Sequence, residues 1–91
     1  MAMIASWLRM DGGHVLEGLQ EAREKLVSAD GELVLDFAPV LRIDPSAVRW
    51  MDNLANAAEE KGVKIVLRSV NVDVYKVLKL VDLAHRFSFV S

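Results

Sequence analysis

The chain has 91 residues and contains no cysteine, which excludes disulfides and thiolate metal sites and fits a reducing compartment. Its only histidines, His14 and His85, are far apart and lack ligand-spaced partners, so a metal site is not expected. Basic residues are not in excess: the chain has 11 Lys and Arg and 13 Asp and Glu, which gives a net charge of −2. Proteins that bind nucleic acid usually carry a basic patch, so we expect no direct nucleic-acid partner.

Long apolar runs are also missing, since none approaches the roughly 18 residues of a membrane-spanning helix. The first ten residues, MAMIASWLRM, lack the basic leader and cleavage pattern of a signal peptide. The only glycine pair, in DGGH (11–14), lacks the lysine and the spacing of a phosphate-binding loop. We therefore expect a cytoplasmic protein with no membrane insertion and no cofactor.

Hydrophobic residues make up 53% of the chain, which is enough for a core. A domain this small still buries a limited share of its surface, so we expect modest stability. Apolar residues recur at helical spacing in three segments, and short β-branched or apolar runs separate them. We predict a single domain over residues 1–91. The expected elements are a strand in 3–10, a helix from 15 to about 28, a strand at 32–37, a helix at 45–61, a strand at 63–70, a helix after Asn71 and a short strand in 86–91.

This alternation predicts an α/β fold: a mostly parallel four-stranded sheet with three main helices, in the order β-α-β-α-β-α-β. The helical stripes and strand runs define a predicted core, which comprises Leu35, Ile43, Val48, Met51, Leu54, Ile65, Leu67, Val77 and Leu78. Aromatic residues are few, at 7%. Trp7 and Phe87 or Phe89 lie on the terminal segments, where they either form an apolar patch for a partner or second copy, giving a homodimer, or fill the core.

The stretch VLRIDPSAVRWM (40–51) reads as a strand end that runs directly into a helix, with Val40, Leu41 and Ile43 strand-like. Asp44 before Pro45 is a typical N-cap arrangement, because proline suits the first helical position. Gly62 and Asn71 are the expected C-cap of this helix and N-cap of the next. Ser46 therefore lies on the first turn of a helix.

Two catalytic arrangements can be considered. Asp36 and Asp44 both follow predicted strands, whose ends share one edge of a parallel sheet, so they could form an acid–base pair. Ser46, His85 and Asp44 contain the residue types of a catalytic triad, but their spacing does not support one. A simpler interpretation is that Asp44 caps a helix and Asp36 accepts hydrogen bonds from the Ala38-Pro39 turn. An enzyme is the weakest of the hypotheses.

Four segments in order resemble the STAS domain, typified by bacterial anti-sigma factor antagonists: VLDF (34–37), IDPSA (43–47), EKGVKIVL (60–67) and VYKVLKLVDL (74–83). The resemblance implies a protein-binding module with no chemistry of its own. Ser46 stands at the position that is phosphorylated in sporulation-type antagonists, while Pro45 and Ala47 replace the serine and glycine of the family pattern. The residues that the resemblance implies for partner binding are Asp36, Asp44, Pro45, Ser46, Ala47, Arg49 and Trp50.

The resemblance leaves two partners open. In the first, this is a partner-switching regulator of transcription that binds an anti-sigma factor, a serine-kinase-like ATPase, and is controlled by phosphorylation of Ser46. In the second, it is the STAS subunit of a bacterial phospholipid-trafficking ABC transporter, whose ATPase contacts the helix in VNVDVYKVLKLVDL (70–83). On the residues alone, Ser46 can also be an ordinary helix-start residue whose hydroxyl bonds to nearby backbone.

Overall fold

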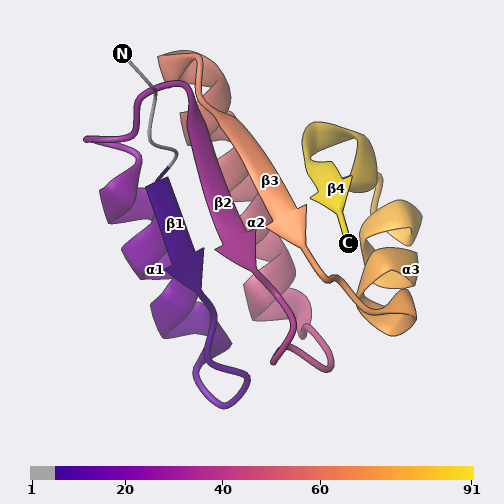
Figure 1. Ribbon diagram of the computed structural model, residues 1–91. Coiled ribbons are helices and arrows are strands. Elements are labelled where there is room, and N and C mark those ends of the chain that lie inside the picture. Colours follow the sequence, from indigo (N-terminus) through magenta and orange to yellow (C-terminus); the bar gives the residue numbers. More distant parts are fainter. Residues whose placement is uncertain (1–5) are drawn as a thin grey trace.

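A computed structural model describes residues 6–91, so the first part of the strand predicted at 3–10 lies outside the described residues. The described chain alternates strands and helices in the predicted order, which confirms the fold class (Figure 1). The elements are β1 (Ser6–Arg9), α1 (Val15–Lys25), β2 (Glu32–Asp36), α2 (Pro45–Lys61), β3 (Lys64–Arg68), α3 (Val72–Leu80), the 3-10 helix η1 (Ala84–Arg86) and β4 (Ser88–Val90).

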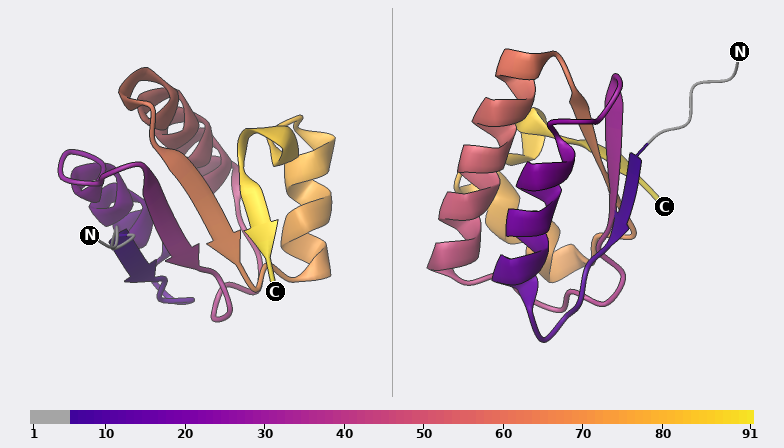
Figure 2. Two further views of the ribbon diagram at one scale, coloured as in Figure 1. Left: turned by 45° about the horizontal axis from the view of Figure 1, so that its top comes forward. Right: turned by 90° about the vertical axis from the view of Figure 1, so that its left-hand side faces the viewer.

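The four strands form one sheet in the order β1-β2-β3-β4, and every neighbouring pair is parallel. Each strand therefore lies beside the next one in the chain, and each crossover contains a helix. Figure 2 shows that α1, α2 and α3 all lie on the same side of the sheet. The carboxyl ends of β1, β2 and β3 lead into the turns that precede α1, α2 and α3, so these turns share one edge of the sheet.

The core lies between the sheet and the helices. Leu33 and Leu35 of β2 are fully buried there, beneath Met51 and Leu54 of α2, which are also fully buried. Most of the predicted core is confirmed. Three of its members are only half-buried at the margin of the core, namely Ile43, Val48 and Val77.

Helix α2 has the boundaries that the sequence predicts, and its ends explain why. The Asp44 carboxylate accepts a hydrogen bond of 2.8 Å from the Ala47 N–H, and Pro45 occupies the first helical position. At the other end, Gly62 adopts a left-handed conformation (φ 68°), which a residue with a Cβ adopts only at a cost. The start of α2 is thus fixed by Asp44 and Pro45.

The strand-like interpretation of Val40, Leu41 and Ile43 is wrong, because residues 37–44 form a loop. The Val40 N–H donates to the Phe37 carbonyl at 2.9 Å, which closes a turn directly after β2. β2 ends at Asp36, which is paired with Arg68, the last residue of β3. Residues after Asp36 therefore have no β3 residues beside them with which to continue the ladder of backbone hydrogen bonds. Val40 is buried by loop packing instead. Asp36 therefore ends a strand and Asp44 does not.

The aromatic residues of the terminal segments do not form one patch. Phe87 is buried at 7% exposure, and Phe89 packs edge-on against Tyr75 of α3 with ring centroids 5.1 Å apart. Trp7 is 46% exposed, and it lies on β1, at the opposite edge of the sheet from β4. The expected patch shared by Trp7 and the phenylalanines is wrong, and Phe87 fills the core instead.

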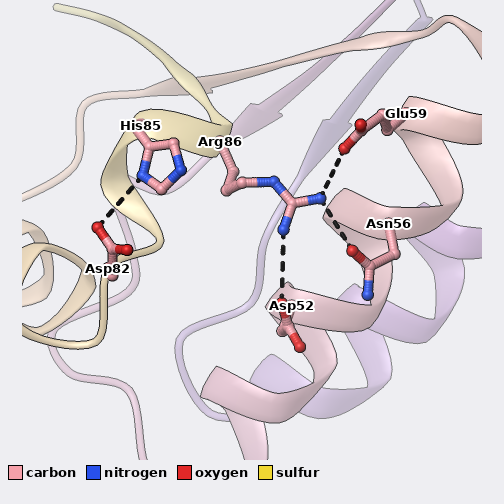
Figure 3. Close-up of polar contacts among 6 residues, drawn as sticks. All are labelled: Asp52, Asn56, Glu59, Asp82, His85 and Arg86. Carbon is pink, nitrogen blue, oxygen red and sulfur yellow. Dashed lines mark hydrogen bonds and ion pairs between the residues drawn. The ribbon is translucent and has the colours of Figure 1, made fainter.

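Arg86 links the C-terminal segment to α2, as Figure 3 shows. Its guanidinium donates to the Asn56 side chain and to the Glu59 carboxylate, each at 2.9 Å, and lies 3.7 Å from the Asp52 carboxylate. The three partners lie on one face of α2 at helical spacing, and Arg86 is only 22% exposed. This contact joins η1 to α2 immediately before β4 begins.

Replacing Arg86 by alanine should lower the free energy of unfolding by about 1 kcal/mol, because charge-assisted hydrogen bonds are lost but their partners stay in contact with water. Urea denaturation followed by circular dichroism measures the change. The matched control is Lys79→Ala, which removes an exposed cation of α3 and should change stability by less than about 0.5 kcal/mol. Equal effects of the two substitutions would show that the Arg86 contacts contribute nothing.

Candidate functional site

The candidate site is the start of α2, at the sheet edge where the strands end. Ser46 lies on the first turn and is half-buried, and its hydroxyl is 3.4 Å from a guanidinium nitrogen of Arg49, one turn further along α2. Ala47 beside it is buried, so its side chain belongs to the core rather than to an interface. Pro45 is exposed. The structure thus brings together Asp44, Pro45, Ser46 and Arg49.

The electrostatics of this site favour an anion. The backbone N–H groups at a helix start carry partial positive charge, and a negative group placed there is typically stabilised by about 0.3–1 kcal/mol. No acidic residue occupies the first turn of α2, and Arg49 adds a full positive charge next to the Ser46 hydroxyl. The Asp44 carboxylate already uses one of its oxygens to cap the Ala47 N–H.

Two open hollows flank the start of α2. Both lie on the side of α1, because Leu16 lines each of them. One, of about 320 Å³, is lined by Leu16, Ser46, Arg49, Trp50 and Asn53. The other, of about 420 Å³, lies between residues 12–17 and residues 42–47. Trp50 is half-buried and packs against the core, so it offers only part of its ring to a hollow. The Asn53 side chain is hydrogen-bonded by Arg23 of α1.

The two carboxylates considered for acid–base chemistry have structural roles. Asp36 accepts a hydrogen bond of 2.9 Å from the Ala38 N–H, as its turn interpretation predicts, and Asp44 caps α2. The residues of the triad have other partners: His85 lies 3.5 Å from Asp82, as Figure 3 shows. Ser46 has Arg49 as its side-chain partner. Within residues 6–91 there is no buried charged or polar side chain.

Over residues 6–91, no three His, Cys, Asp or Glu side chains are grouped so that they could hold a metal ion. The helices of the same part of the chain are too short or too polar to cross a membrane. His14 is exposed and lies 3.7 Å from Glu17, one turn along α1, which fits a surface residue.

Comparison with known families decides the classification. The family model for the STAS domain matches residues 13–91. The chain belongs to the STAS domain family. Among solved structures, this STAS domain is similar to a protein from Thermotoga maritima that is provisionally named an anti-sigma factor antagonist. The TM-score is 0.70 at 18% identity, over 90% of this chain and 71% of that one, which establishes a shared fold. Comparison with curated proteins finds no significant match.

One positioning residue of this STAS domain has a role that the sequence did not predict. Asn71 caps α3 by accepting a hydrogen bond of 2.8 Å from the Val74 N–H, as expected. Its amide nitrogen also donates to the carbonyls of Val40 and Leu41, at 3.3 Å and 3.0 Å. Asn71 therefore ties the loop before α2 to the start of α3. The one hint of this role in the sequence is that residue 71 is asparagine and not aspartate, because only an amide side chain can both donate and accept hydrogen bonds.

Replacing Asn71 by aspartate should keep the cap of α3 but lose both bonds to the loop, since a carboxylate cannot donate. Replacement by alanine should lose both functions and cost about 1–2 kcal/mol of unfolding free energy. Hydrogen exchange of the Val40 to Asp44 amides should accelerate in both variants, while the Val74 amide should stay protected only in Asn71→Asp. Unchanged exchange of the loop amides in both variants would show that Asn71 does not hold the loop.

Proposed function

We propose that this STAS domain is a non-catalytic partner-switching module, in which the start of α2 binds a protein partner and phosphorylation of Ser46 releases it. The observation that carries the proposal is the position of Ser46 on the first turn of α2, with Arg49 as its neighbour and no acidic residue in that turn beyond the capping Asp44. Such a site accepts a phosphate without loss of the fold. Ser46 and Arg49 also line one of the two hollows beside α2.

The proposed switch depends on how much it costs to place a phosphate charge in water and in a protein interface. A phosphate adds about −1.5 to −2 charges, which the helix N-terminus and Arg49 can stabilise in the free protein. In a desolvated contact the same charge would need a paired group on the partner, and an unpaired buried charge costs about 2–5 kcal/mol. Unphosphorylated Ser46 brings no such cost. The partner is therefore bound by the unmodified chain and lost from the phosphorylated one.

The loop before α2 provides the rest of the proposed contact. Leu41 is 71% exposed and Arg42 is exposed, whereas Val40 between β2 and Leu41 is buried. Asn71 holds the carbonyls of Val40 and Leu41, so the exposed Leu41 side chain is presented from a tethered backbone. In this proposal Asp36 and Asp44 shape the loop and the helix start, and Pro45, Ser46, Arg49 and Trp50 supply the surface.

The proposed partner is an anti-sigma-factor-like serine kinase with an ATPase fold, acting in the bacterial cytoplasm. Two findings support this class. The chain belongs to the STAS family, and the Thermotoga maritima protein of the same fold is provisionally named an anti-sigma factor antagonist. A kinase partner also supplies the phosphoryl group for Ser46, so one protein would both bind and release this chain.

A second candidate function is that of the STAS subunit of a phospholipid-trafficking ABC transporter, and α3 favours it. Its exposed side carries Val72 and Leu80, which are 66% and 86% exposed, and Tyr75 beside Phe89 is 39% exposed. Apolar side chains grouped on one exposed helix are typical of a protein interface. In this alternative the transporter ATPase binds α3, and Ser46 has no switching role.

Capture of partners from the native host with the intact tagged chain tests the proposal. Mass spectrometry should identify a serine-kinase-like ATPase, and that protein should be lost when the bait carries Ser46→Asp but retained with Leu80→Ser. Capture of a transporter ATPase that is lost with Leu80→Ser and retained with Ser46→Asp would establish the alternative and refute the switch.

A further inference from the structure

The sheet face opposite the helices carries an ordered pattern of charges. In β2, Leu33 and Leu35 are fully buried against the helices, so the alternate residues point to the other side. The same alternation holds in β3, where Ile65 and Leu67 face the core. The outward-pointing residues of these two central strands are Glu32, Val34 and Asp36 from β2, and Lys64, Val66 and Arg68 from β3.

The strand register arranges these residues in three rows. Glu32 is paired with Lys64, Val34 with Val66 and Asp36 with Arg68. Both outer rows therefore place a carboxylate on β2 beside a cation on β3, and the middle row is apolar. The neighbouring strands extend two of the rows, because Trp7 of β1 is in register with Val34 and Ser88 of β4 with Val66. Arg9 of β1 is in register with Asp36 and adds a second cation to that row.

Within residues 6–91, no helix lies on this face, as Figure 2 shows. Lys64 and Arg68 are exposed, and Trp7 is 46% exposed, with the Arg68 guanidinium 5.3 Å from its ring centroid. Sheets made only of parallel strands normally have both faces covered. The open face of this sheet is thus an unusual feature that a partner would remove.

We propose that the open face binds the same face of a second copy of this chain. The two copies are related by a two-fold axis that lies between the two stacked sheets, parallel to the strands and over the gap between β2 and β3. This axis places β2 over β3 of the second copy and keeps the order of the rows. Glu32 then faces Lys64 of the second copy, Asp36 faces Arg68 of the second copy, and the two valines face each other. Every charge of the central strands meets its opposite.

The charge pattern also excludes the other aligned arrangement. A two-fold axis across the strands would reverse the order of the rows and place each strand over its own copy. Glu32 would then face Asp36 of the second copy, and Lys64 would face Arg68, so all four contacts would be repulsive. Like charges in contact are an effective way to reject a wrong pairing. The pattern therefore selects one isologous dimer.

The dimer is expected to be weak. Four strands about 4.8 Å apart and three to five residues long give a face on the order of 300 Å², well below the roughly 800 Å² that each partner buries in a stable complex. Val66 at its centre is only 6% exposed, so the apolar row adds little and the charges contribute most of the specificity. Association should therefore appear only at high protein concentration and should weaken with added salt.

Sedimentation equilibrium of the full chain tests this dimer through charge reversal. Lys64→Glu places two carboxylates opposite each other, and Glu32→Lys places two cations opposite each other, so each variant alone should associate about tenfold more weakly than the wild type. An equimolar mixture of the two variants restores opposite charges at every contact. We expect the mixture, and the double variant alone, to recover wild-type association.

Matched controls are Glu60→Lys on α2 and Lys76→Glu on α3, which change the net charge equally but lie on exposed helix positions. They should leave association unchanged. A wild-type chain that stays monomeric at about 1 mM, or a mixture that associates no better than each single variant, would overturn the proposal. The open face lies away from α2, so this result is independent of the Ser46 switch.

Discussion

Replacing Leu54 by alanine should lower the free energy of unfolding by about 2–5 kcal/mol, the range measured when a buried leucine is truncated. Leu54 lies on α2 and is fully buried between that helix and the sheet. The loss combines the apolar surface removed from the core with the cavity that remains. Because a domain of this size has only modest stability to begin with, the variant should be largely unfolded in mild urea.

The chain offers a matched control for this change in Leu80→Ala, since Leu80 is 86% exposed on α3. Truncation at an exposed position away from the core should change stability by less than about 0.5 kcal/mol. Urea titrations of both variants, followed by far-UV circular dichroism, give the two free energies directly. If Leu54→Ala were as mild as Leu80→Ala, the packing of α2 on the sheet would not be the main source of stability.

Ser46→Asp is expected to weaken binding of the proposed ATPase partner at least about tenfold, equal to roughly 1.4 kcal/mol, while leaving the fold intact. The carboxylate lies on the first turn of α2 beside Arg49, so the Tm should be unchanged or slightly raised. In the complex the same charge lies within the contact and has to be desolvated. Calorimetric titration of each variant against the captured partner measures the difference.

Two controls accompany this experiment. Ser46→Ala removes the hydroxyl without adding charge and should retain both stability and affinity. Ser28→Asp adds the same charge at an exposed position after α1 and should leave the affinity unchanged. Equal affinities of the wild type, Ser46→Asp and Ser46→Ala would mean that Ser46 is only a helix-start residue, and the transporter-type function would become the better account.

The parts of the fold that could be predicted from the sequence are those fixed by local chemistry. The first and last residues of α2 are set by Asp44-Pro45 at one end and Gly62 at the other. Each of these three residues affects only the backbone close to it in the sequence. The core stripe of Met51 and Leu54 follows from helical periodicity. The position of Ser46 on the first turn of α2 was predictable for the same reason.

What could not be predicted depends on neighbours far away in the sequence. Val40 and Ile43 are as apolar as strand residues, but whether they extend a strand depends on where β3 ends, about 25 residues later. Asn71 was recognisable as a cap, whereas its bonds to Val40 and Leu41 span 31 and 30 residues. Arg86 likewise finds Asn56 and Glu59 only after the chain has folded.

The charge pattern of the open sheet face could be predicted only in part. The alternation of polar and apolar residues in β2 and β3 is visible in the sequence, but which acid lies beside which base depends on the strand register. A shift by one residue would exchange the faces of the strand. The pairing of Glu32 with Lys64 and of Asp36 with Arg68 therefore required the structure.

The most direct test of the Ser46 switch is phosphoryl transfer itself. The purified chain is incubated with the captured ATPase and ATP, the phosphate is located by mass spectrometry, and the affinity of the modified and unmodified chains for that ATPase is compared. We predict that Ser46 carries the phosphate and that the modified chain binds at least about tenfold more weakly. A chain that stays unmodified, or that is phosphorylated at Ser46 with no loss of affinity, would contradict the account.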